Sequence, residues 1–288
     1  NLRFYKQIEV LFSKLNPATV ITTYEGHPWE RLAFYAARLS NPSVNCVGYQ
    51  HAIIFPMQHS IQRSFGTLFD PNIVLFSGQS ALDWFSSHSN FSPTIDVAGT
   101  PRFSLLPNSV QSKFNSLRSN PCCLLLPDGV PSESLAIFKF GLSCACTYPN
   151  IRFRIRFHPL VSHKMLSDLD PSLVSLPSNF TISSQPIDCD FADCLWAIYR
   201  GSGSAIRAAM SGLRPIYFND ASLGLSIDAL YMLQTWRREI SATDSLSTIF
   251  NAVLCQSSDS FCYEYVSVRD QLNSFLSPYN PNSFLKFI

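Results

Sequence analysis

Hydrophobic residues along this chain fall into two alternating patterns. Short continuous apolar runs are typical of strands that are buried on both faces of a sheet. Strands are expected at 18–23, 45–49, 72–76, 94–97, 122–126, 151–157, 179–183, 195–199 and 214–218, although in 151–157 the apolar residues alternate with arginines. Apolar positions at helical spacing predict helices at 2–15, 30–39, 58–65, 80–85, 132–147, 204–211, 243–254 and 259–275, and an acidic turn is expected at 188–193. The alternation predicts an α/β protein with parallel sheets.

A polar stretch rich in serine and asparagine interrupts this alternation at 104–120 and contains one short predicted helix. Because such stretches are typical of domain boundaries, we expect a first domain over 1–112 and a second over 113–288. Both are expected to be Rossmann-like and to face each other across a cleft, with ligands at the carboxyl ends of the strands. The first half shows only four strands and begins with Asn1 instead of Met, which leaves room for an N-terminus missing from this sequence.

Composition and charge exclude several classes of protein. A net charge of +1 with no cluster of Lys and Arg argues against a nucleic-acid-binding surface and against a polybasic membrane patch. No apolar run approaches the roughly 18 residues of a spanning helix, and the start has no signal-peptide pattern. The nine cysteines are odd in number and lack zinc or disulfide spacing, which favours a reducing compartment. We therefore expect a cytoplasmic protein.

The segment 195–218 predicts a strand, a tight turn, a helix and a second strand. Its turn contains Ser202, Gly203 and Ser204, and Ser204 is expected to cap the helix. A Gly/Ser turn that opens a helix leaves backbone N–H groups unpaired at the positive end of the helix dipole, which suits a phosphate. An ordinary βα turn explains the same residues equally well.

Two further polar groups follow predicted strands of the second half. His158-Pro159 ends the strand in which Arg152, Arg154 and Arg156 alternate with apolar residues, and Pro159 restricts the backbone of His158. An imidazole there can donate a hydrogen bond to a phosphate, although a surface histidine is the commoner case. Asp128-Gly129 follows the strand at 122–126; its carboxylate can accept from a ribose or a base, or simply form a Pro-Asp-Gly turn.

Candidate catalytic groups lie in the first half, where Glu25 follows a strand in the segment YEGHPWE. A carboxylate there has the minimum chemistry of a general base or a nucleophile. His27 precedes a proline at the next helix, and Glu30 is expected to interact with the dipole of that helix. His51 follows the neighbouring strand in GYQHA and would emerge near Glu25, although a structural histidine is at least as common.

Other sites are not supported by the motifs present. The sequence has no GxxxxGK[ST] phosphate loop, and GSGSAI matches the dinucleotide fingerprint only loosely. HExxH is absent, and no DxD-type pair argues for a bound metal, so no metal and no bound cofactor are expected.

Taken together, the strand-end elements PDG (127–129), HP (158–159) and SGS (202–204) resemble the second half of GT-B glycosyltransferases, most of all those that use CMP-activated ulosonic acids. These include bacterial sialyltransferases and the Kdo transferases of capsule and O-antigen assembly. The resemblance implies that Asp128, His158, Ser202, Gly203 and Ser204 contact the CMP. YEGHPWE and GYQHA also look like segments of surface-carbohydrate transferases. Retaining Kdo transferases carry an aspartate nucleophile in the first half, where this chain has His51, so Glu25 is the best carboxylate.

The resemblance predicts transfer of Kdo or a related ulosonic acid from a CMP donor to a bacterial glycan or glycolipid, without a metal. Glu25 would act as base or nucleophile, oriented by His27 or His51, and Arg102 and Arg200 are candidates to pair with the carboxylate of the donor. A CDP-glycerol-type phosphotransferase, a UDP-sugar transferase or epimerase, and a non-catalytic module of a larger polysaccharide-assembly protein remain alternatives. Peripheral association with the inner membrane is compatible with this function.

Overall fold

The computed structural model describes residues 2–57, 60–103 and 110–287, and the chain divides into two compact units. Unit 1 comprises Asn1–Phe103 together with Asn273–Ile288, and unit 2 comprises Ser104–Leu272. The division therefore falls before the expected boundary at 112/113. It also assigns the last part of the chain to unit 1, whereas the sequence pattern placed all of 113–288 in the second domain.

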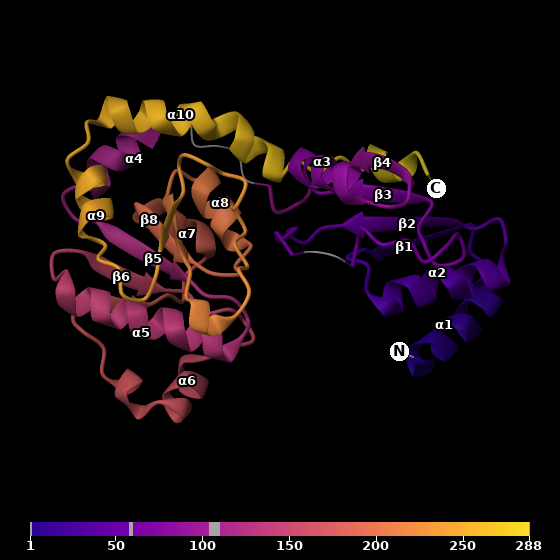
Figure 1. Ribbon diagram of the computed structural model, residues 1–288, viewed down its shortest axis with the longest axis horizontal. Helices are drawn as coiled ribbons and strands as arrows, with labels where there is room; N and C mark the ends of the chain where they lie inside the picture. The colour runs from indigo at the N-terminus through magenta and orange to yellow at the C-terminus, as the bar shows by residue number, and fades with distance from the viewer. Residues whose placement is uncertain (1, 58–59, 104–109, 288) are drawn as a thin grey trace. The chain divides into compact units, whose positions relative to one another are not determined.

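Unit 1 is built on a parallel sheet in the order β1-β2-β3-β4. Helix α2 packs against β1 and carries α1 on its outer side, and α3 packs against β3 and β4 (Figure 1). The elements are α1 (Leu2–Leu15), β1 (Thr19–Thr23), α2 (Pro28–Ser40), β2 (Asn45–Gln50), β3 (Ile73–Phe76), α3 (Gln79–His88) and β4 (Thr94–Val97). Strand β3 is buried at every position, as its continuous apolar sequence predicts.

The C-terminal segment belongs to unit 1 because its backbone bonds to the ends of β3 and β4. The N–H of Ser277 donates to the carbonyl of Ser77 at 2.9 Å, and the N–H of Asn280 donates to that of Ala98 at 2.8 Å. A Cβ at Gly99, where φ is +69°, would lie only 1.9 Å from the carbonyl oxygen of Pro278. Glycine is thus required where this segment, which ends in α11 (Asn282–Leu285), crosses the sheet.

Unit 2 contains a six-stranded parallel sheet in the order β10-β9-β8-β5-β6-β7. If the six strands are numbered 1 to 6 along the chain, from β5 to β10, and the sheet is read from its β7 edge, the order is 3-2-1-4-5-6. This is the doubly wound order of a Rossmann fold. Its strands are β5 (Cys122–Leu126), β6 (Arg152–Ile155), β7 (Phe180–Ile182), β8 (Trp196–Tyr199), β9 (Arg214–Phe218) and β10 (Arg238–Ile240). The central strands β5, β8 and β9 are buried throughout, which explains the uninterrupted hydrophobic sequences of β5 and β8.

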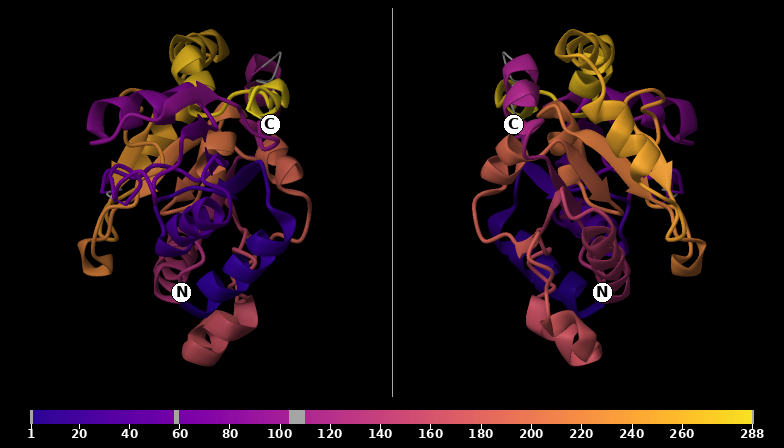
Figure 2. Two further views of the ribbon diagram at one scale, coloured as in Figure 1. Left: turned by 90° about the vertical axis from the view of Figure 1, so that its right-hand side faces the viewer. Right: turned by 90° about the vertical axis from the view of Figure 1, so that its left-hand side faces the viewer.

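Helices cover the sheet of unit 2, and the segment that contains α6 extends away from the body of the unit (Figures 1 and 2). The helices are α4 (Val110–Leu117), α5 (Pro131–Thr147), α6 (His163–Leu169), α7 (Ile187–Asp193), α8 (Ser204–Met210), α9 (Ser247–Leu254) and α10 (Ser258–Phe275), with 3-10 turns at Pro171–Val174 and Ala221–Leu223. Helix α10 packs by aromatic contacts, since Phe261 stacks on Phe114 at 4.4 Å and Trp236 meets Phe261 edge-on at 5.1 Å.

Two α/β units with parallel sheets confirm the predicted fold class, but several local predictions were wrong. The expected acidic turn at 188–193 is helix α7, because Asp190 turns inward to the arginines of β6. The helix expected at 58–65 is absent from the residues described there, since 60–62 form a turn and 63–65 are irregular, and positions 58 and 59 lie outside the described residues. None of the described helices is long and apolar enough to span a bilayer.

Candidate functional site

The strand order of unit 2 places a topological switch point between β5 and β8. These adjacent strands run parallel, and the chain continues from them toward opposite edges of the sheet, which is the arrangement at whose carboxyl end doubly wound folds bind ligands. Asp128 and Gly129 follow β5, and the segment 200–204 follows β8. The groups singled out in the sequence therefore lie where doubly wound folds bind their ligands.

The two loops at this switch point are in close contact. A Cβ at Gly201 would lie 2.8 Å from Oδ2 and 2.9 Å from Cβ of Asp128, and Gly201 has a φ of +69°. Asp128 is itself fixed, since its Oδ1 accepts the N–H of Val130 at 2.8 Å. Burial raises the pKa of the Asp128 carboxyl, while the N–H of Val130 and the ring of His158 oppose the shift.

His158 lies beside the same loop. A Cβ at Gly129 would lie 2.9 Å from Nδ1 and 3.1 Å from Cε1 of the imidazole, so the ring rests against the backbone of Gly129. Nδ1 accepts the N–H of Leu160 at 3.3 Å, which leaves the proton of the neutral ring on Nε2. The residue is exposed, as is Pro159. His158 thus presents a hydrogen-bond donor at the end of β6, next to the switch point.

The turn after β8 differs in one detail from the prediction. Gly203 occupies the cap position of α8 without a side-chain hydrogen bond, and Ser204 is the first helical residue, so the expected serine cap was wrong. The N–H groups of Ala205 and Ile206 bond to the carbonyls of Ser202 and Gly203. Those of residues 202, 203 and 204 have no acceptor within the part of the chain that the structure describes. This turn therefore offers three backbone donors at the positive end of a helix.

Arg200 has a different role from the one expected of it. The residue is fully buried, and its guanidinium donates to Oε2 of Glu133 at 2.9 Å, to the hydroxyl of Tyr217 at 2.9 Å and to the carbonyl of Leu225 at 2.8 Å. These contacts fasten the loop after β8 to α5 and β9. Because its donors are used internally, Arg200 is not free to pair with the carboxylate of a donor sugar.

Two residues that the sequence analysis did not assign to the site support its backbone. Glu133, the partner of Arg200, lies in the first turn of α5, and burial raises the pKa of its carboxyl. Ser134 is fully buried, and its hydroxyl donates to the carbonyl of Asp128 at 2.9 Å. The cap of α5 is Val130, so Ser134 holds the preceding loop and does not cap the helix. A serine and an acid in the first helical turn were the only sequence signals for these contacts.

In unit 1, Glu25 and His27 lie together after β1. Oε2 of Glu25 is 3.6 Å from Nε2 of His27, and both side chains are partly exposed. Glu30 is buried and accepts the N–H groups of Glu25 at 3.0 Å and His27 at 2.7 Å, so it shapes this loop in addition to facing the helix dipole. Burial raises the pKa of Glu30, and the two N–H groups oppose the shift.

His51 follows β2, which pairs in parallel with β1 so that Thr23 lies opposite Tyr49. Glu25 comes two residues after Thr23, and His51 comes two residues after Tyr49, so the two residues lie at the same edge of the sheet. The ring of His51 lies 6.0 Å from that of Tyr49, and its buried Nδ1 has no hydrogen-bond partner among the residues described. Arg102, the other proposed carboxylate ligand, is exposed, and its N–H donates to the hydroxyl of Thr100 at 3.2 Å.

Comparison with solved structures identifies the fold. A Listeria monocytogenes protein assigned as a UDP-N-acetylglucosamine 2-epimerase is 12% identical, with a TM-score of 0.62 over 98% of this chain and 75% of its own. The glycotransferase of kitacinnamycin is 12% identical, with a TM-score of 0.59 over 98% of this chain and 78% of its own. Acinetobacter baumannii MurG is 11% identical, with a TM-score of 0.56 over 94% of this chain and 74% of its own. This chain has a GT-B-type fold.

The GT-B-type fold is supported by structure alone, because no protein-family model matches the sequence and no curated protein does so. At 11–12% identity these similarities extend to the path of the backbone and not to individual side chains. The site residues named above consequently depend on their own geometry.

Proposed function

We propose that this chain is a nucleotide-sugar-dependent glycosyltransferase whose unit 2 binds the nucleotide at the β5–β8 switch point. The observation that supports this most directly is the convergence of the loops after β5, β6 and β8. They bring the carboxylate of Asp128, the imidazole of His158 and three backbone N–H groups of the turn 202–204 to neighbouring strand ends. Backbone donors at a helix start favour phosphate, and a carboxylate can accept from ribose hydroxyls.

Charge on the departing phosphate would be stabilised by the amides of 202–204 and by the Nε2–H of His158. Removing a single hydrogen-bond donor that points at developing charge typically lowers the catalytic rate by about 10²–10³-fold. In unit 1, Glu25 would deprotonate the acceptor hydroxyl or attack the anomeric carbon, and Nε2 of His27 lies 3.6 Å from its Oε2. We expect the acceptor to be a glycan or glycolipid and the reaction to take place in the cytoplasm, without a metal.

Two donor classes are favoured by different observations. The strand-end motifs resemble those of CMP-Kdo transferases, which favours a CMP-activated ulosonic acid. The similar structures include an enzyme named for UDP-N-acetylglucosamine, which favours a UDP-sugar. The internal bonds of Arg200 remove one of the two arginines proposed for an ulosonic carboxylate, so we place UDP-sugars first.

The donor can be tested by titrating the full chain with UDP, CMP and CDP by calorimetry. Release of the nucleotide from UDP-GlcNAc, CMP-Kdo and CDP-glycerol is then followed. His158→Ala should weaken binding of the preferred nucleotide and slow turnover by about 10²-fold. The control is His163→Ala, whose ring in α6 bonds to the carbonyl of Leu173 and not to the switch-point loops. Glu25→Gln should abolish transfer while leaving nucleotide binding near that of the wild type.

Failure to bind any of the three nucleotides would contradict the proposal and favour a non-catalytic module. Near-normal transfer by Glu25→Gln would contradict only the role assigned to Glu25. Release of a CMP moiety from CMP-Kdo, or from CDP-glycerol, without any reaction of a UDP-sugar would reverse the order of donors given above.

A further inference from the structure

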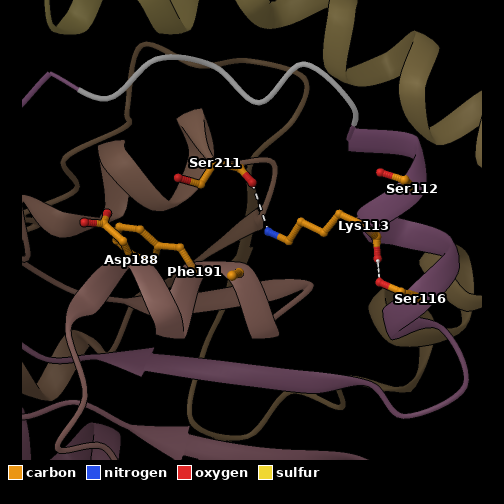
Figure 3. A pocket seen from close by; sticks show the side chains of 7 residues that line it. Ser112, Lys113, Ser116, Asp188, Phe191 and Ser211 are labelled. Atoms are coloured by element: carbon orange, nitrogen blue, oxygen red, sulfur yellow. Dashed lines mark hydrogen bonds between the residues drawn. The ribbon is translucent and has the colours of Figure 1, made fainter.

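Unit 2 contains a cavity of about 590 Å³ that the proposed function does not use. Helix α4, helix α7 and the C-terminal end of α8 form its walls (Figure 3). Its lining residues are Ser112, Lys113, Ser116, Asp188, Phe191, Ala192 and Ser211. Ser112, Ser116 and Asp188 are exposed, which places them at a rim that opens to solvent.

The side chain of Lys113 crosses this cavity from α4 (Figure 3). Its Nζ donates to the carbonyl of Ser211 at 2.9 Å, and Ser211 is the cap residue at the C-terminus of α8. Lys113 thus satisfies a carbonyl at the negative end of the helix whose other end forms the turn 202–204.

The ammonium group of Lys113 has little compensation for its charge. Asp188 is the carboxylate in the wall, and it pairs with Arg207 at 2.6 Å instead. No acid among the described residues lies within ion-pair distance of Nζ. Burial lowers the pKa of Lys113 to about 8, with Asp193 and Cys194 opposing the shift. The amine is therefore partly neutral, and nucleophilic, near physiological pH.

We propose that Lys113 is a preferred site of acyl modification, open through the cavity to small acyl phosphates or acyl thioesters. The Nζ lone pair would attack the acyl carbon, an amide bond would form as phosphate or thiolate leaves, and the ammonium proton would pass to solvent. The product is uncharged and larger by the acyl group, which the cavity has room to accept.

Acylation would weaken the contact between Lys113 and the end of α8. A neutral amide N–H is a poorer donor to the carbonyl of Ser211 than an ammonium group, and it no longer offsets the helix dipole. Amides in the last turn of α8, around Ala208, Ala209 and Met210, should consequently exchange faster with solvent.

The modification is tested by treating the full chain with acetyl phosphate at pH 7.5 and measuring acetylation at each lysine by peptide mass spectrometry. A pKa near 8 leaves about a quarter of Lys113 neutral at this pH, against about 0.1% for an ordinary lysine. Allowing for the weaker nucleophile, we expect initial acetylation of Lys113 to be about tenfold faster than that of the exposed Lys164. Equal or slower acetylation of Lys113 would overturn the proposal.

The effect on α8 is tested with two variants that need no nucleotide. Lys113→Gln imitates the neutral product, whereas Lys113→Arg retains the charge and cannot form the amide. Hydrogen exchange of a peptide covering 204–213 should be faster in the glutamine variant than in the arginine variant. Equal exchange in both would overturn the proposed effect on α8. The labelling of the wild-type chain does not depend on the folding of either variant or on the proposed glycosyltransferase activity.

Discussion

Replacing Gly201 with alanine tests whether the loops after β5 and β8 are held against each other. The positive φ of +69° costs an alanine about 1–2 kcal/mol. The new Cβ would also lie 2.8 Å from Oδ2 of Asp128 and 2.7 Å from Cδ1 of Ile227. Relieving this overlap must break the bond from Asp128 to Val130 or displace a loop, which adds about 1–3 kcal/mol. The free energy of unfolding should fall by about 2–5 kcal/mol in total.

Urea unfolding followed by tryptophan fluorescence measures this loss, since Trp196 and Trp236 are both buried in unit 2. Gly212→Ala is the matched control because its φ is +82° and the atoms nearest to its Cβ would be those of the Val110 side chain, at 3.1 Å or more. That variant should cost about 1–2 kcal/mol from the backbone conformation, with only a small further shift required of Val110. If both variants lose the same stability, the two loops are not in contact and the geometry inferred for the switch point is wrong.

Three further changes give independent checks. Gly129→Ala should turn the exposed ring of His158 away from residue 129, at a cost in stability under about 1 kcal/mol. The movement should shift the imidazole NMR signals of His158, and unchanged signals would contradict the contact between the ring and Gly129. Glu30→Ala should destabilise unit 1 by about 1–3 kcal/mol in urea, because two partly buried N–H groups lose their acceptor, and Glu30→Gln should cost less. The unfolded chain holds the Lys113 proton more tightly than the folded chain does, so the folded state gains stability as the pH rises from 8 to 10. The free energy of unfolding of the wild type, measured relative to that of Lys113→Gln, should rise over this range by up to about 1.4 kcal/mol per pH unit. A difference that does not change with pH would refute the lowered pKa of Lys113.

The sheets could be predicted from sequence because their central strands are buried on both faces. CCLLL in β5 and WAIY in β8 are uninterrupted apolar runs, and every residue in them is buried. The alternation of arginine with apolar residues in β6 was likewise predicted, and the arginines do share one face. Patterns of this kind depend only on neighbours in the sequence, which is why they are readable without a structure.

Helix α7 escaped prediction because its sequence, IDCDFAD, has three acidic residues among seven. Asp190 is nevertheless fully buried, since Arg154 and Arg156 of β6 bond to its two carboxylate oxygens at 3.1 and 2.9 Å. A buried acid paired with distant arginines cannot be told from a solvated one by local hydrophobicity. The return of the C-terminal segment to unit 1 depends on similarly distant contacts.

The candidate site was predicted in part for the same reason. Asp128, His158 and the turn 202–204 could be placed because each directly follows a predicted strand, and parallel strands bring their ends to one edge. The function of Arg200 could not be placed in this way. Its partners Glu133 and Tyr217 lie 67 and 17 residues away in sequence, and only the packing of α5 and β9 brings them together.

The contacts of Arg200 and Ser134 also bear on which donor the site accepts. Both side chains are fully buried and bind backbone or internal polar groups behind the loops, so they stabilise the loops without facing a ligand. The groups left on the outer side are backbone N–H donors, one imidazole and one carboxylate, a set that matches a phosphate and a ribose. A donor with its own carboxylate needs a cation as well, and the guanidinium of Arg200, which directly follows β8, is already neutralised by Glu133. This balance of charge is the physical reason to test UDP-sugars before CMP-activated ulosonic acids.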